Sequence, residues 1–333
     1  MADMRHSPIT ASVDFDVDGV QHGFLKLPYS RDDAAWGAIM IPVTVVRNGE
    51  GPTALLTGGN HGDEYEGPIA LFDLATSLPA DEITGRVIIV PAMNYPAFRV
   101  GRRTSPIDNG NMNRVFPGRP DGSVTEKIAD YFQRFLLPLA DMVLDIHSGG
   151  KTLDFLPFAA AHILPDKAQQ ARCVAAMEAF AAPYSVMLLE IDNVGMYDTA
   201  AEDLGKTFVS TELGGGGSAS ACTVAIARRG IRNVLKHAGI LAGEIAREPS
   251  VKLNMPDASC FVTGESSGLL ELCADLGDRV REGQVIARVH NVERSGLVPV
   301  KYCAGIDGIL AGRHYPGLTQ PGDVLAVVAV PET

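Results

Sequence analysis

Short apolar runs alternate with amphipathic stretches between residues 53 and 245. The apolar runs predict buried strands, and apolar residues spaced three and four apart predict helices. This alternation is typical of an α/β fold, in which helices flank a parallel or mixed sheet. The polar segment 109–118 is too rich in Gly and Asn for either element, so we expect a loop there. The predicted strands cover 53–58, 87–91, 142–146 and 208–211, and the predicted helices cover 68–77, 124–137, 166–181 and 218–243.

The pattern changes near residue 248. Beyond this point the chain has no helical period and shows short alternating strands separated by Gly, Asp and Pro. Such a pattern predicts an all-β unit. We therefore expect two domains, a catalytic α/β domain at 1–248 and a small all-β domain at 249–333.

The all-β segment contains an internal repeat. Residues 280–289 match residues 319–328, with Gly283 and Gly322 in register. Two similar halves predict a small barrel or sandwich, and the pattern resembles the lipoyl/biotinyl-like barrel-sandwich fold. Carriers of that fold present a modified lysine on an exposed hairpin, whereas Lys301 lies in a different sequence context. We expect a structural or dimerising module, with a carrier domain as the alternative.

Composition and charge narrow the possible partners. The 333 residues are 46% hydrophobic and 20% charged, as in globular proteins, and the net charge of −12 argues against a nucleic-acid or anionic-membrane surface. No apolar run approaches the roughly 18 residues of a membrane span, and acidic residues stand where a signal peptide has its apolar core. The five cysteines are widely spaced and form no C-x-x-C motif. We therefore expect a cytoplasmic protein without disulfides.

The strongest candidate chemistry is a metal site. His61 and Glu64 lie three residues apart in a Gly-rich segment that directly follows a predicted strand, and His147 follows another strand. Strand ends at the carboxyl edge of an α/β sheet are where ligand sites gather. Two histidines and one glutamate are a typical ligand set of catalytic Zn²⁺. The alternatives are a surface His–Glu pair at a helix start and a buried strand histidine that bonds a neighbour.

A proton carrier and anion-binding groups complete this candidate site. Glu212 ends a predicted strand before a run of four glycines, where a carboxylate beside a metal-bound water can act as a general base. Its alternative role is to cap the next helix. Arg102, Arg103 and Arg114 lie in the polar loop region, and arginine binds carboxylates or stabilises an oxyanion. Solvated loop charges are the alternative for each of them.

Together these motifs resemble the succinylglutamate desuccinylase/aspartoacylase family, the deacylase branch of the zinc carboxypeptidase superfamily. The family pattern G-x-H-G-x-E, N-R-x-F, D-x-H and a strand ending in Glu appears in this order over residues 58–217. The all-β C-terminal domain also belongs to the pattern. The resemblance implies a zinc-carboxypeptidase-like mixed sheet and hydrolysis of a small N-acylated amino acid by one Zn²⁺ per chain. We also expect a homo-oligomer, a dimer, which the C-terminal module could pair.

The resemblance also assigns roles to individual residues. The oxyanion arginine is the least secure, because Arg103 precedes Asn113 by ten residues where the family has about eight; we choose Arg103 over Arg102. The implied roles are zinc ligation by His61, Glu64 and His147, proton transfer by Glu212, oxyanion stabilisation by Arg103, and carboxylate binding by Asn113 and Arg114.

Within the family, the sequences of segments 58–68 and 105–118 resemble those of the deacetylases of ectoine degradation, which hydrolyse Nα-acetyl-L-2,4-diaminobutyrate. The free amine of that substrate needs an acidic partner, for which Glu190 and Asp192 are candidates. Glu66 and Asp145 are candidates for orienting the ligands. Alternative substrates are succinylglutamate and N-acetylaspartate. A non-catalytic zinc- or ligand-binding protein is the second hypothesis, but such a protein has no need of Glu212.

Overall fold

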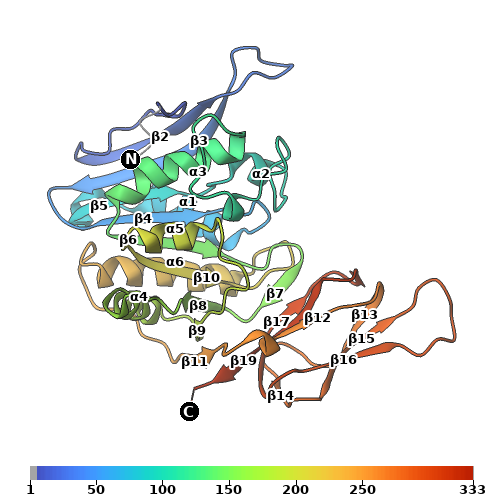
Figure 1. The fold of residues 1–333 in the computed structure, drawn as a ribbon. Helices are drawn as coiled ribbons and strands as arrows, with labels where there is room; N and C mark the ends of the chain where they lie inside the picture. Colours follow the sequence, from blue (N-terminus) through green and yellow to red (C-terminus); the bar gives the residue numbers. More distant parts are fainter. Residues whose placement is uncertain (1–5, 333) are drawn as a thin grey trace.

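The computed structural model describes residues 6–332, and a large mixed sheet forms its centre (Figure 1). Three parallel strands lie side by side in this sheet, in the order β4 (Thr53–Gly58), β6 (Met142–His147) and β10 (Thr207–Glu212). Beyond β4, the sheet continues through β5 (Gly85–Val90), β3 (Ala38–Asn48), β2 (Gly19–Pro28) and β1 (Thr10–Ala11). Beyond β10, it continues through β8 (Phe158–Ala161) and β9 (Tyr184–Met187).

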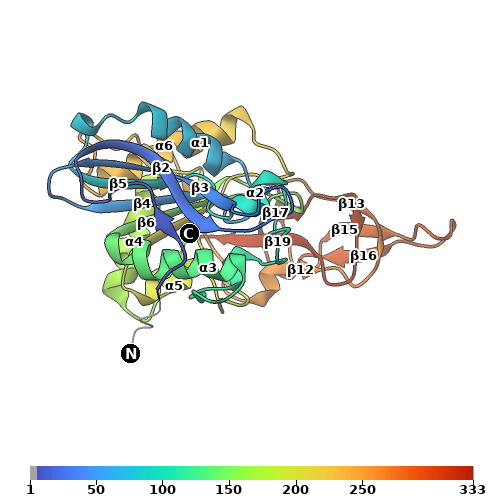
Figure 2. The same ribbon diagram turned by 90° about the horizontal axis from the view of Figure 1, so that it is seen from above.

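Helices cover both faces of the sheet, and Figure 2 shows α1 and α6 on the opposite side from α3 and α5. The first group consists of α1 (Glu66–Ser77), α4 (Lys167–Phe180) and α6 (Ala221–His237). The second face carries α2 (Tyr95–Arg99), α3 (Val124–Tyr131) and α5 (Tyr197–Asp203). Short 3₁₀ turns at Ala80–Glu82, Met112–Arg114, Leu137–Leu139 and Ala258–Cys260 and a π-helical turn at Phe132–Leu136 complete the helical elements.

Burial on both faces explains the continuous apolar runs of the central strands. Every residue of β4 and β6 is buried, because helices pack against the sheet from both sides. Two polar side chains of β6, Asp145 and His147, are buried as well. Buried polar groups need partners, so these two positions indicate a site where the sequence departs from a purely apolar strand.

The chain after residue 248 first extends the large sheet and then forms a second one. β11 (Val251–Asn254) pairs with β9 and with β19 (Val324–Pro331), so the ladder continues from the α/β part into the C-terminal unit. The predicted boundary at 248/249 stays a prediction. β19 pairs with β12 (Phe261–Thr263) and β17 (Gly308–His314), and β17 pairs in turn with β7 (Leu153–Phe155) and β14 (Arg279–Val280). The separate antiparallel sheet consists of β16 (Val300–Cys303), β15 (Val285–His290), β13 (Gly268–Leu272) and β18 (Leu318–Thr319).

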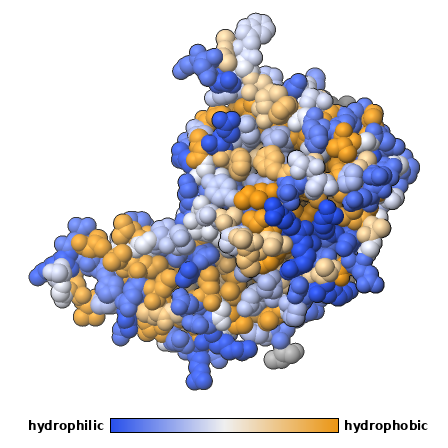
Figure 3. Space-filling view, turned by 180° about the vertical axis from the view of Figure 1, so that it is seen from behind, coloured by the Kyte–Doolittle hydropathy of each residue, from blue (hydrophilic) through white to orange (hydrophobic). Residues whose placement is uncertain are grey.

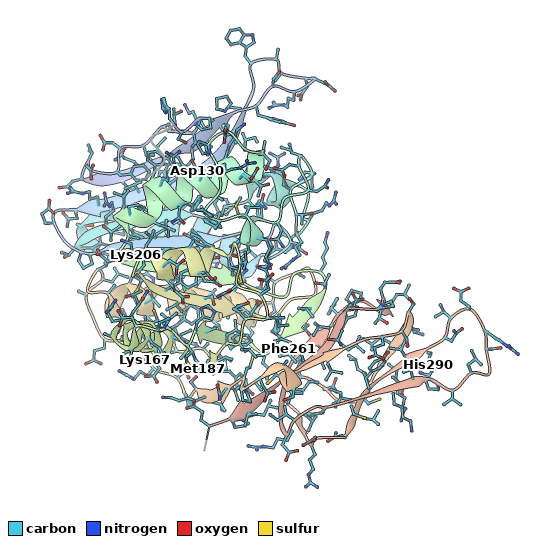
Figure 4. The ribbon with its side chains drawn as sticks, in the orientation of Figure 1. Asp130, Lys167, Met187, Lys206, Phe261 and His290 are labelled. Carbon is cyan, nitrogen blue, oxygen red and sulfur yellow. The ribbon has the colours of Figure 1, made fainter. Side chains whose placement is uncertain are left out.

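The C-terminal unit projects from the main body as a lobe of interspersed hydrophobic and hydrophilic residues (Figure 3). In Figure 4, Phe261 marks the junction with the α/β part, and His290 lies in the projecting sheet. An apolar cluster spans the junction and joins Phe158 of β8 and Val186 of β9 to Leu253 of β11 and Ile309 of β17. The lobe is therefore attached through both a strand ladder and a shared core.

The predicted α/β fold with a separate β-rich C-terminal part is confirmed at the level of a large mixed sheet and a second antiparallel sheet. The four predicted strands and four predicted helices are present, but two helix ends were wrong. The segment 124–137 leaves the α-helical conformation after Tyr131, and α6 ends at His237 instead of residue 243. The predicted loop at 109–118 contains one 3₁₀ turn. In the described part of the chain, no helix is long and apolar enough to cross a membrane.

Candidate active site

The candidate site lies at the carboxyl ends of the three central parallel strands. In the strand register, Gly58 of β4 stands beside Ile146 of β6, and Glu212 of β10 stands beside His147 of β6. The sheet therefore brings together the loop after β4 and the last residues of the two neighbouring strands. This is the edge at which open α/β sheets bind their ligands.

A close backbone contact fixes the loop that carries His61. A Cβ atom on Gly62 would lie 2.1 Å from the carbonyl carbon of Ala97, so only glycine allows this approach to α2. The Gly62 N–H donates a hydrogen bond to the backbone oxygen of Arg102 at 3.0 Å. These two backbone contacts of Gly62 therefore position the adjacent His61.

Three side chains from this edge converge on one point. Glu64 Oε1 lies 2.7 Å from His61 Nδ1, and Glu64 Oε2 lies 2.8 Å from His147 Nδ1. All three residues are buried, and their potential ligand atoms lie within 4.8 Å of one another. Two imidazole nitrogens and a carboxylate in this arrangement can hold a metal ion. The structure thus places the three predicted ligand residues in one cluster.

Burial and charge set the protonation of this cluster. Burial alone would raise the pKa of Glu64, but the adjacent His61 and His147 outweigh it and hold this pKa well below its usual range. Burial lowers the pKa of His61. It also acts to lower the pKa of His147, but Asp145 and Glu64 outweigh this and raise the His147 pKa well above its usual value. Glu64 is therefore an ionised carboxylate between two imidazoles.

Second partners orient both imidazole rings. Asp145 Oδ2 lies 2.7 Å from His147 Nε2, and Thr57 donates a hydrogen bond to Asp145 Oδ1 at 2.6 Å. His61 Nε2 lies 3.2 Å from Asn111 Oδ1. Contacts of this kind hold a ring so that its other nitrogen, here Nδ1, faces a metal. Asp145 was a sequence candidate for this role, whereas Asn111 was missed.

Glu66, the other candidate for orienting the ligands, lies elsewhere. Its Oε1 accepts a hydrogen bond from Thr223 of α6 at 3.1 Å. Burial raises its pKa. Within residues 6–332, Glu66 forms no hydrogen bond to His61 or His147. It links α1 to α6 through Thr223.

The His–Glu–His cluster lines a cavity with a volume of about 150 Å³, and Glu212 borders this cavity as well. Its Oε2 atom is buried and has no hydrogen-bond partner among the described residues. Burial, followed by the negative charge of Glu64, raises the pKa of Glu212 to about 8. Glu212 is thus a carboxyl group held next to the His–Glu–His cluster without a structural partner.

Two arginines also line this cavity. Arg103 Nη1 lies 3.8 Å from Glu64 Oε1, and its side chain is 44% exposed. Arg114 reaches the cavity while its Nη1 donates to the backbone oxygen of Asn113 at 2.6 Å. Asn113 is buried, and its Oδ1 accepts a hydrogen bond from the Tyr197 N–H at 2.9 Å. The side chain of Arg102 does not border the cavity.

Comparison with known proteins agrees with this geometry. Residues 50–238 match the model of the succinylglutamate desuccinylase/aspartoacylase catalytic domain. The chain belongs to this family. The resemblance drawn from the sequence motifs is therefore confirmed, and the matched segment contains every residue of the cluster around Glu64.

Several relatives match almost the whole chain. A protein of Halomonas elongata named N-alpha-acetyl-L-2,4-diaminobutyric acid deacetylase is 60% identical over 98% of this chain and 96% of its own length. The product-bound structure of the ectoine utilization protein EutE (DoeB) from Ruegeria pomeroyi is 64% identical, covers 98% of this chain and 99% of its own, and gives a TM-score of 0.97. A succinylglutamate desuccinylase structure from Silicibacter sp. TM1040 is 62% identical, covers 99% and 100%, and gives a TM-score of 0.96.

The candidates for binding an amine divide between two places. Glu190 borders the cavity of the His–Glu–His cluster, whereas Asp192 is exposed and borders only an adjoining groove, which Glu190 and Glu212 border as well. A further carboxylate, Asp198 of α5, also borders this cavity and was missed by the sequence analysis. Asp198 belongs to no recognisable motif, so only the fold brings it there.

Proposed function

We propose that this family member is a zinc-dependent amidohydrolase that converts Nα-acetyl-L-2,4-diaminobutyrate to acetate and L-2,4-diaminobutyrate in ectoine catabolism. The relative from Halomonas elongata carries the name of this activity and is 60% identical over nearly the full chain. The observation that carries the proposal is Glu212, a buried carboxyl oxygen without a partner beside the His–Glu–His cluster. A protein that only binds a ligand does not need such a group.

The donor set of the cluster fits zinc. Zn²⁺ prefers imidazole nitrogen and carboxylate oxygen, and three protein ligands leave one position open for catalysis. His61, Glu64 and His147 offer these donors, and Asn111 and Asp145 occupy the second nitrogen of each ring. We infer one Zn²⁺ per chain. When bound, zinc polarises the amide carbonyl and lowers the pKa of water from about 15.7 to about 7.

The protein's own groups then carry the proton and bind the substrate. Glu212 accepts a proton from the attacking water at its free Oε2 and delivers it to the leaving nitrogen. Arg103, at the exposed side of Glu64, stabilises the negative charge that develops on the amide oxygen. Asn113 and Arg114 hold the α-carboxylate, for which a guanidinium is the suitable partner.

The C-terminal unit limits the size of the substrate. Leu153 and Phe155 of β7 border the cavity, and β7 pairs with β17 of the C-terminal unit through Phe155–Gly312 and Leu153–His314. The cavity of about 150 Å³ suits a small acylated amino acid, and it adjoins a groove of about 460 Å³ that Met255, Phe261 and Val324 of the C-terminal unit border. We propose that this unit, domain 249–333, is a barrel-sandwich module that shapes the cavity of domain 1–248 and pairs subunits in a cytoplasmic dimer. Residues 1–5 and 333 of these ranges lie outside the described residues.

Release of the acyl group as free acid from a panel of substrates tests this function. Nα-acetyl-L-2,4-diaminobutyrate, N-succinylglutamate and N-acetylaspartate are incubated with the zinc-loaded protein, and the liberated acid and amine are quantified. We expect the diaminobutyrate derivative to be hydrolysed with the highest kcat/KM. A higher kcat/KM for another acyl amino acid would contradict the proposed substrate. A metal-loaded protein that hydrolyses none of the three would be a binding protein and not an enzyme of this class.

A further inference from the structure

The cavity has an acidic end that the mechanism above does not use. Glu190 and Asp198 border it together with the His–Glu–His cluster. Behind them, His162 Nδ1 lies 2.9 Å from Glu202 Oε1, and His162 Nε2 lies 3.6 Å from Glu190 Oε1. Potential ligand atoms of His162, Glu190 and Asp198 all lie within 4.8 Å of one another. We call these four residues the acidic end.

The acidic end carries more negative charge than it can neutralise. Three carboxyl groups face one imidazole, and burial together with the charge of Glu190 raises the pKa of Asp198 to about 6. The His162 side chain is only 10% exposed; burial acts to lower its pKa, but Glu190 and Glu202 outweigh this and raise the pKa well above its usual value. His162 is therefore one positive charge among three carboxyl groups, and like charges held this close together favour a further cation at this place.

The position of the acidic end indicates which cation it serves. Arg114 borders the same cavity, so one enclosed space offers a guanidinium and, separately, a pair of carboxylates. A substrate with both a carboxylate and an ammonium group can match both. Glu212 borders this cavity as well, and Glu190 and Glu212 also border the adjoining groove. A small molecule undergoing reaction beside Glu212 therefore lies near these carboxylates.

We propose that Glu190 and Asp198 bind the side-chain ammonium group of the substrate and thereby select an N-acylated diamino acid. This inference rests on the proposed function, because it concerns the same cavity. His162 is a positioning residue, held between Glu202 and Glu190 and contacting no substrate. Acylated amino acids with an acidic side chain, such as succinylglutamate, are repelled by the same two carboxylates.

A pair of substrates of equal shape isolates this interaction. Nα-acetyl-L-norvaline carries a methyl group where Nα-acetyl-L-2,4-diaminobutyrate carries its ammonium group. Loss of a hydrogen bond to a charged group is expected to change the preference by about 10–100-fold. We therefore expect Glu190→Gln and Asp198→Asn each to lower kcat/KM for the diaminobutyrate derivative by about this factor, while hydrolysis of the norvaline derivative is unchanged or faster. Asp32→Asn is the matched control, since this exposed carboxylate lies between β2 and β3 and does not border the cavity.

Product binding gives a readout that does not depend on catalysis. Calorimetry should show that the wild type binds L-2,4-diaminobutyrate more tightly than L-norvaline, and that both variants lose this difference. An equal loss of activity on both substrates, or a wild type that does not distinguish the two products, would overturn the inference. Two tightly bound metal ions per chain, one of them lost in Asp198→Asn, would make the acidic end a metal site. If the wild type hydrolyses no acyl amino acid, the proposed function fails, and the calorimetry still decides about the acidic end.

Discussion

Replacement of Glu212 by glutamine removes the proposed proton carrier while keeping its size. The carboxyl oxygen Oε2 has no hydrogen-bond partner among the described residues, so the substitution breaks no structural contact there. Loss of a general acid–base group lowers kcat by about 10²–10⁴, which corresponds to about 2.7–5.5 kcal/mol of transition-state stabilisation. Because Asn113 and Arg114 are proposed to bind the carboxylate, we expect KM to change little.

The raised pKa of Glu212 gives a second magnitude for the same variant. This pKa is about 8, compared with 4.5 for an exposed glutamate. At 1.36 kcal/mol per pH unit, ionising Glu212 in the metal-free fold costs on the order of 5 kcal/mol. The cost is absent below pH 4.5, increases as the pH rises towards 8, and stays constant above it. Metal-free Glu212→Gln should therefore be more stable than the metal-free wild type at pH 9 and nearly equal to it at pH 4.5.

Three measurements on this variant decide its role. Metal analysis should find the same zinc content as in the wild type, acetate release should show the loss in kcat, and urea unfolding at the two pH values should show the difference in stability. Glu293→Gln, which neutralises an exposed carboxylate in the C-terminal unit, is the matched control. A Glu212→Gln protein that has lost its metal would make Glu212 a ligand, and one with the wild-type kcat would refute the proton-carrier role.

Further substitutions test the other parts of the account. His61→Ala should lose its metal, and its kcat/KM should fall by more than about 100-fold. His290→Ala, in the projecting sheet, should keep the metal content and the kcat/KM of the wild type. Elemental analysis that finds full metal in His61→Ala would contradict this. Arg103→Gln should lower kcat by about 10²–10³ while Arg102→Gln leaves it unchanged in steady-state assays, and the reverse result would exchange their roles. A chain ending at Ala246 loses β11 and its share of the core at the junction, so we expect aggregation in size-exclusion chromatography; a folded monomer with unchanged activity would show that the C-terminal unit is dispensable.

The approach of His61, Glu64 and His147 to one another could be predicted from the sequence because it follows local signals. The Gly-rich segment around His61 fixes a tight loop, and strand β6 carries two polar residues in an otherwise apolar run. Each signal is contained in a few consecutive residues of the sequence. Parallel pairing of the strands then brings Glu212 beside His147 without further information.

The acidic end and the second partner of His61 could not be predicted in this way. Asp198 lies on α5 and His162 directly after β8, so their approach depends on how distant elements pack. Asn111 precedes the 3₁₀ turn, and its Oδ1 accepts a hydrogen bond from the Asn113 N–H, so its approach to His61 depends on how the loop folds. The N-terminal strands β2 and β3 were also missed, because the alternation of strands and helices that guided the prediction begins only at residue 53.

The proposed deacetylase activity requires a metal ion held by His61, Glu64 and His147. The most direct test measures acetate release from Nα-acetyl-L-2,4-diaminobutyrate by purified protein before chelation, after chelation, and after stepwise return of zinc. We expect chelation to abolish the activity and the activity to return in full at one Zn²⁺ per chain. Undiminished acetate release from protein verified to be free of metal would contradict it.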